Sequence, residues 1–132
     1  MTAIDSNVLI RLLTRDDPEQ YRQAREFLQE NAPVWVTHIS LIETVWVLSR
    51  SYKQGKEQIV ALLEMMLCHH DFHLQEPGVV EGALRSWKGA KADFADCLIL
   101  QTVKKEGQEP LASFDRDLAA LDDVHLITAT RE

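Results

Sequence analysis

Hydrophobic and polar residues along this chain alternate between two kinds of segment. Short apolar runs, typical of buried strands, occupy residues 2–4, 34–37, 72–74, 110–114 and 124–127. Between them lie longer segments whose apolar residues recur every three or four positions, as they do on one face of a helix. These segments predict helices over residues 7–14, 18–31, 39–52, 56–69, 79–88 and 94–106, with a shorter one over 116–121.

The alternation of strands and helices predicts an α/β fold. Helical crossovers between strands would produce one short parallel sheet of four or five strands, with helices on both faces. Prolines and glycines support these boundaries: Pro18 and Pro77 stand at expected helix starts, and Gly55, Gly89 and Gly107 at expected turns or helix ends. In such a sheet, ligands bind beyond the carboxyl ends of the strands.

The composition suits one domain spanning residues 1–132, because a chain of this length with 45% hydrophobic residues can bury a sizeable core. Asp5 stands where a signal peptide would be apolar, and no stretch approaches about 20 apolar residues. We therefore expect a cytoplasmic protein with no membrane segment. Cys68 and Cys97 lie apart in apolar stretches, which favours buried thiols in a reducing compartment.

The charge of the chain restricts how it can act on nucleic acid. Its formal net charge of -7 opposes non-specific binding to phosphate. An acidic protein can still bind nucleic acid if several acids gather around a metal ion, because the ion neutralises them while Lys and Arg elsewhere contact phosphate. The positions of the acids are therefore decisive.

Four aspartates stand near predicted element boundaries. Asp5 follows the first strand and Asp115 the fourth, so both are expected at the same rim of the sheet, although each also suits a helix N-cap. Asp93 begins the sixth helix, and capping is the favoured interpretation of that residue. Asp96 shares a helix face with Ile99 and is expected to point inward, although the helix dipole also favours an acid there.

Glu43 is the acid that no cap or dipole explains, because it lies inside a predicted helix. Ile39 precedes it by four residues and Trp46 follows it by three, so it falls in an apolar stripe. A carboxylate in such a stripe should be neutral, paired or bound to a metal ion. An ion pair with Arg50, two helical turns away, is the competing explanation.

Other residues near these acids offer weaker indications. Ser6, Asn7 and Ser113 can hold metal-bound water or orient carboxylates, although each is also an ordinary turn or cap residue. His69 and His73 can form a metal-ligand pair, but we interpret them as common cationic residues near a helix C-terminus. An all-carboxylate site suits Mg²⁺ or Mn²⁺ and not zinc.

The four acid-bearing segments, residues 4–9, 42–48, 93–99 and 113–115, resemble the PIN-domain nucleases in order and spacing. Among these, a chain this short looks most like the VapC-type toxins of toxin–antitoxin pairs. The resemblance implies a PIN-like three-layer sandwich and a Mg²⁺- or Mn²⁺-dependent endoribonuclease that cuts structured RNA. It also implies a small cognate antitoxin that holds the enzyme inactive, and a homodimer.

By position, the resemblance assigns the core acids to Asp5, Glu43 and Asp96, and the fourth acid to Asp115. Asp5 and Asp96 would be the main metal ligands, Glu43 a ligand or a water-orienting base, and Asp115 a second-site or outer ligand. Two alternatives stay open. One is a PIN nuclease outside any toxin pair, acting in RNA processing or on DNA, and the other is a PIN-like interaction module without catalysis.

Overall fold

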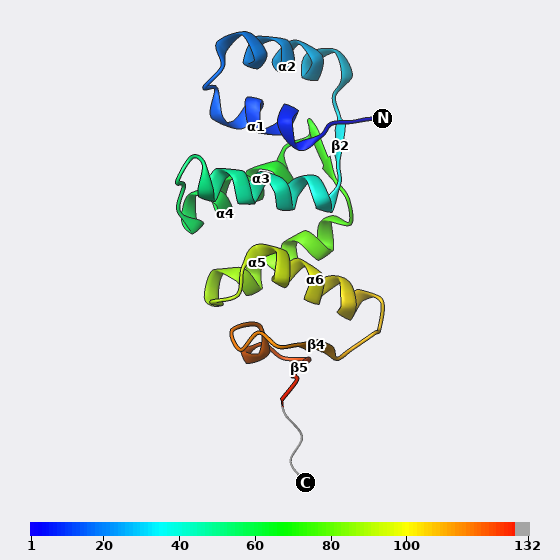
Figure 1. Ribbon diagram of the computed structural model, residues 1–132. Coiled ribbons are helices and arrows are strands. Elements are labelled where there is room, and N and C mark those ends of the chain that lie inside the picture. Colours follow the sequence, from blue (N-terminus) through cyan, green and yellow to red (C-terminus); the bar gives the residue numbers. More distant parts are fainter. Residues whose placement is uncertain (129–132) are drawn as a thin grey trace. The chain divides into compact units, whose positions relative to one another are not determined.

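The structure, a computed structural model, describes residues 1–128 (Figure 1). The chain divides into two compact units, unit 1 (Met1–Pro77) and unit 2 (Gly78–Glu132). Each unit is described by itself.

Unit 1 contains three parallel strands in the order β1-β2-β3, each joined to the next by a pair of helices. Thr2 pairs with Val34, and Val34 pairs with Phe72 on its other side. Helix α1 packs on α2 and α3, and α3 packs on α4. The elements are β1 (Thr2–Ala3), α1 (Ser6–Thr14), α2 (Pro18–Asn31), β2 (Val34–Val36), α3 (His38–Arg50), α4 (Lys56–Cys68) and β3 (Phe72–Leu74).

Polar side chains tie the α1–α2 turn to the end of α3. Arg15 ends α1 in the left-handed conformation (φ 56°), and Asp17 caps α2, whose first residue is Pro18. Between them, Asp16 accepts a hydrogen bond from Arg11 Nη1 at 3.0 Å and another from the hydroxyl of Tyr52. The hydrogen bond from Tyr52 is the largest of the effects that lower the pKa of the Asp16 carboxyl.

Unit 2 pairs two helices with a small parallel sheet, in which Leu111 of β4 pairs with Val124 of β5. Gly82 leaves room for the side chain of Gln101, since an added Cβ there would lie 2.6 Å from Gln101 Oε1. The rings of Trp87 and Phe94 lie 5.5 Å apart in the core. The elements are α5 (Pro77–Gly89), α6 (Phe94–Lys105), β4 (Leu111–Ser113), the 3-10 turn η1 (Leu118–Ala120) and β5 (Val124–Leu126).

The α/β fold predicted from the sequence is confirmed, and the predicted strands and the first six helices end within two residues of the observed ones. Over the described residues the five strands form a three-stranded and a two-stranded sheet. The last predicted helix is only the turn η1. In residues 1–128, no helix is both long and apolar enough to span a membrane.

The two cysteines differ in their surroundings. Cys97 is buried as expected, but Cys68 is exposed at the end of α4. The prediction that both thiols are buried was therefore wrong for Cys68. Cys68 is the last residue of α4, and side chains in the final turn of a helix can be exposed even when the surrounding sequence is apolar.

Candidate active site

In unit 1, Asp5 forms the junction between β1 and α1. The backbone enters it from the sheet, where the N–H of Ile4 donates to the carbonyl of Trp35 at 3.0 Å. Its own conformation is extended (φ -90°, ψ 179°), and its Oδ1 accepts from the N–H of Val8 at 3.1 Å. Asp5 is therefore an N-cap, and its exposed carboxylate stands at the carboxyl end of a strand.

A hollow of about 490 Å³ opens beside Asp5. It is lined by Ala3, Ile4, Asp5, Val8 and Phe27. Phe27 was not singled out in the sequence, and its only signal was an apolar side chain on a strongly polar helix.

A second hollow, of about 210 Å³, runs between α1 and α2. It brings Asn7 to the same surface as Arg11. Its lining residues are Asn7, Val8, Arg11, Gln20, Gln23 and Ala24. A basic side chain thus lies one helical turn beyond Asn7.

Glu43 lies on an exposed face of α3, which contradicts the expectation that it sits in a buried stripe. Ile39 is 71% exposed and Trp46 58% exposed, so the stripe that contains Glu43 is not the core-facing one. The buried face of α3 consists of Ser40, Leu41, Thr44, Val45 and Leu48. Because this helix is apolar on more than one side, periodicity alone chose the wrong face.

The competing explanation of Glu43 also fails. The guanidinium of Arg50 lies 4.6 Å from the ring centre of Trp46, in a cation–π contact. Among the residues that the structure describes, no ion pair joins Glu43 to Arg50. Glu43 therefore presents its carboxylate to solvent from α3, the helix that packs on α1.

In unit 2, Asp93 caps α6, as predicted. Its Oδ1 accepts from the N–H of Asp96 at 2.9 Å. Asp96 itself is half-buried, and Ile99 on the same face is 47% exposed. Leu100, also on that face, is 1% exposed, so the expectation that Asp96 points inward holds only in part.

Asp115 follows β4 and organises the turn after it. Its Oδ1 accepts from the N–H of Asp117 at 2.8 Å and from that of Leu118 at 3.2 Å. The N–H of Asp115 in turn donates to Ser113 Oγ at 2.9 Å. Ser113 thus acts as an ordinary turn residue that holds the backbone of Asp115, which is the alternative interpretation given above.

The carboxylates of unit 2 act on one another. The pKa of Asp96 is raised from 3.8 to about 6, first by partial burial, then by the charge and hydrogen bond of Asp93, and then by the charge of Asp115. Such a shift means that the ionised form of Asp96 is destabilised in the protein alone. A bound dication would relieve this repulsion, and oxygen donors are the ligands that Mg²⁺ and Mn²⁺ prefer.

The candidate residues thus divide between the two units. Unit 2 joins Asp93 and Asp96 at the start of α6 and places Asp115 near enough for its charge to act on Asp96, with Ser113 beside Asp115. Unit 1 places Asp5, Ser6 and Asn7 at the start of α1 and Glu43 on α3. Because α1 and α3 follow adjacent parallel strands, both helices begin at the same edge of the three-stranded sheet.

Comparison with known proteins identifies the family. The PIN domain profile matches residues 2–124, a span that includes every candidate acid in both units. The chain therefore belongs to the PIN domain family. It is also similar to the VapC ribonuclease of Aquifex aeolicus (strain VF5), with 26% identity over 120 residues that cover 88% of each chain.

Proposed function

We propose that this chain is a Mg²⁺- or Mn²⁺-dependent endoribonuclease, the toxin of a toxin–antitoxin pair, and that it cleaves structured RNA. The observation that carries the proposal is the environment of Asp96, where partial burial first, then the adjacent Asp93 and then the charge of Asp115 raise its pKa to about 6. Repelling carboxylates are an unfavourable arrangement for a protein alone and a favourable one for a dication. Membership of the PIN family and the name of the similar ribonuclease support the same reaction.

In this proposal the chain functions as a single domain, and the roles of the acids are those that the family resemblance implies. Asp5 and Asp96 are the main metal ligands, Glu43 a ligand or water-orienting base, and Asp115 a second or outer ligand. The family profile supports a single domain because it runs through both units.

The ion, when bound, supplies an activated water and neutralises charge that develops on the phosphate. Hydrogen bonds within the chain fix the positions of the carboxylates. Asp5 keeps one oxygen on the N-terminus of α1, which fixes its carboxylate at the end of β1. Asp93 holds the first turn of α6, on which Asp96 stands, and Ser113 holds the backbone of Asp115. Ser6 and Asn7 are the polar groups available beside Asp5.

The partners in this proposal follow from charge. A net charge of -7 makes general attraction to RNA weak, so phosphate would be held through the metal ion and nearby basic residues such as Arg11. The same acids suit a small antitoxin that inserts a basic side chain among them. We also propose a homodimer, as the family resemblance implies.

A cleavage assay tests the proposal. Purified protein is incubated with structured cellular RNA and Mn²⁺, Mg²⁺ or a chelator, and the new RNA ends are mapped. We expect metal-dependent cuts from the wild type and from Asp122→Asn, and none from Asp96→Asn; Asp122 is an exposed acid of the same unit that serves as the matched control. If the protein cleaves RNA but no neighbouring gene encodes a small protein that inhibits it, a nuclease outside a toxin pair is favoured. Absence of cleavage with both ions would favour an interaction module.

A further inference from the structure

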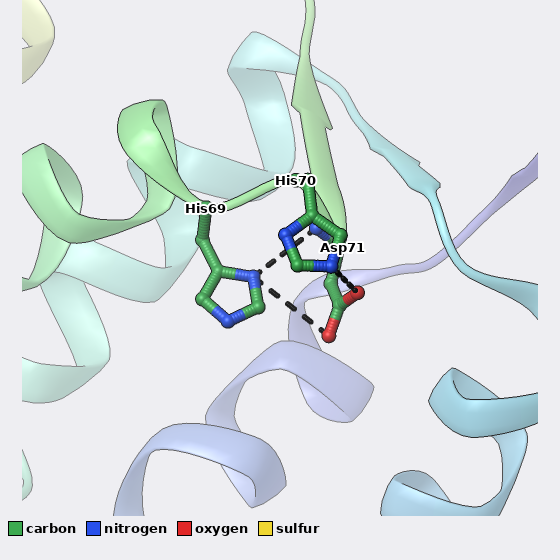
Figure 2. A group of neighbouring side chains, drawn as sticks. All are labelled: His69, His70 and Asp71. Carbon is green, nitrogen blue, oxygen red and sulfur yellow. Dashed lines mark hydrogen bonds and ion pairs between the residues drawn. The ribbon is translucent and has the colours of Figure 1, made fainter.

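The short loop that joins α4 to β3 brings together two histidines and an aspartate, His69, His70 and Asp71 (Figure 2). One metal-ligating atom from each lies within 4.8 Å of the others. The Asp71 carboxylate serves both rings, since its Oδ2 lies 3.7 Å from His69 Nδ1 and its Oδ1 3.4 Å from His70 Nε2. The two imidazole rings are stacked, with centres 5.1 Å apart and planes 11° apart.

The backbone of this loop is anchored to the sheet. The carbonyl of Asp71 accepts from the N–H of Val34 at 2.9 Å, and the carbonyl of His69 accepts from the N–H of Phe72 at 3.1 Å. The ring of His69 also meets the ring of Phe72 edge-on at 5.8 Å. The side chains nevertheless remain accessible, because His70 is 92% exposed and Asp71 30% exposed. An ion can therefore reach accessible side chains whose backbone is anchored to the sheet.

A hydrogen bond within the loop shows which nitrogen of the His69 ring carries a lone pair. The backbone N–H of Asp71 donates to His69 Nδ1 at 3.1 Å. Nδ1 therefore acts as an acceptor, which is the state in which an imidazole nitrogen binds a metal ion. An ion at Nδ1 would displace this N–H, and water can replace the lost partner at an exposed loop for a small net cost.

The separations and the donor types identify the class of ion. Ligand atoms around a tetrahedral ion, with bonds of about 2.0 to 2.1 Å, lie roughly 3.3 Å apart. The two imidazole–carboxylate separations, 3.7 Å from His69 to Oδ2 and 3.4 Å from His70 to Oδ1, are close to this value. Because the stacked rings are nearly parallel, the exposed ring of His70 must rotate for both nitrogens to face one ion. Two imidazoles and one carboxylate suit Zn²⁺, Ni²⁺ or Cu²⁺, whereas Mg²⁺ prefers oxygen donors alone.

We propose that His69, His70 and Asp71 form a second cation site, which binds one transition-metal dication of the Zn²⁺ class and completes its coordination with water. The site is separate from the proposed nuclease acids and does not depend on them. A bound ion would connect the C-terminal end of α4 to the start of β3, and so stabilise unit 1. The sequence analysis considered only His69 with His73 and favoured a non-metal interpretation; His73 lies on β3 and is absent from this cluster.

Calorimetric titration with Zn²⁺ tests the proposal on the full chain. The protein carries Asp5→Asn and Asp96→Asn, and the buffer contains excess Mg²⁺, so that the nuclease acids do not contribute. We expect about one Zn²⁺ per chain, with affinity falling at least about ten-fold in His69→Ala and in His70→Ala. His73→Ala is the matched control and should bind as the parent does.

Two further measurements keep the result unambiguous. Zn²⁺ should raise the melting temperature of the parent and not that of His70→Ala, whose fold is checked by circular dichroism. Cys68→Ser should retain binding, because Cys68 is not part of the cluster. The proposal is overturned if the parent takes up no Zn²⁺ at tens of micromolar, if His70→Ala binds like His73→Ala, or if only Cys68→Ser abolishes binding.

Discussion

The N-caps of α1 and α6 have nearly the same local geometry and very different electrostatics. Asp5 accepts from the N–H three residues on at 3.1 Å, and Asp93 does so at 2.9 Å. In α1 the donor is Val8, whose side chain is neutral. In α6 the donor is Asp96, so the capping bond brings a second carboxylate close to the first, and Asp115 adds a third charge.

This difference shows that capping and ligand geometry are not competing explanations of the same residue. A cap positions a carboxylate at a helix N-terminus, where the dipole stabilises it. Whether the position also suits a metal ion depends on the charges that the fold brings beside it. The two caps should therefore respond differently when charge or cap is removed.

The largest effect is expected on catalysis. Asp5→Asn and Asp96→Asn should each lower metal-dependent RNA cleavage by at least about a hundred-fold, because an amide is a poor ligand for Mg²⁺. Glu43→Gln should also lose activity, whereas Glu30→Gln, a matched change of an exposed acid on α2, should not. Cleavage rates of purified variants measure this. Full activity in Asp5→Asn would show that Asp5 is only a helix cap and not a metal ligand.

A smaller effect is expected on stability in the presence of metal. Mn²⁺ at a hundred times its dissociation constant should stabilise the wild type by about 2.7 kcal/mol, and excess chelator should remove the gain. Asp96→Asn should show almost no gain, since its repulsion has already been relieved and a ligand is lost. Thermal melts with and without Mn²⁺ give the comparison. An equal Mn²⁺-induced rise in wild type and Asp96→Asn would contradict a site at Asp96.

Removal of each cap should lower the unfolding free energy by different amounts in α1 and α6. Asp5→Ala should cost about 1 kcal/mol of unfolding free energy, the usual cost of a lost N-cap. Asp93→Ala should cost less, because loss of the cap is partly offset by relief of the repulsion on Asp96. Urea denaturation without metal measures both. Asn keeps the cap, so Asp5→Asn should leave stability unchanged and Asp93→Asn should raise it. Equal costs for the two Ala variants would mean that the charges around Asp96 have little effect.

The smallest effect is a dependence of stability on pH. Because the pKa of Asp96 is raised from 3.8 to about 6, the folded protein keeps a proton that the unfolded chain has already lost. Its stability relative to Asp96→Asn should therefore fall as pH rises from about 4 to about 6, and then stay level. Urea titrations of the two proteins across this range measure the difference. The slope should be shallower in the Asp93→Asn background, and a slope of opposite sign would refute the assigned shift.

The sequence by itself determined the features that depend on neighbouring residues. Strand and helix segments followed from apolar periodicity, and the caps at Asp5 and Asp93 followed from hydrogen bonds that span only three residues. The order of the acid-bearing segments was enough to indicate the PIN family, which the profile match confirmed. These features depend on residues close together in the sequence or on the order of segments, so the sequence alone is enough to predict them.

Tertiary structure alone decided which side of each element is buried and which charges meet. Glu43 lies on the exposed face of α3 because the core took the stripe containing Leu41 and Leu48, a choice that periodicity cannot make for a helix apolar on several sides. The pKa of Asp96 depends on Asp115, which lies beyond α6 and β4 in the chain. His70, rather than His73, joins His69 because strand β3 begins directly after Asp71 and carries His73 away from the loop. Each result depends on packing between segments distant in the sequence or on the direction of a side chain in space, and neither quantity is a property of the linear chain.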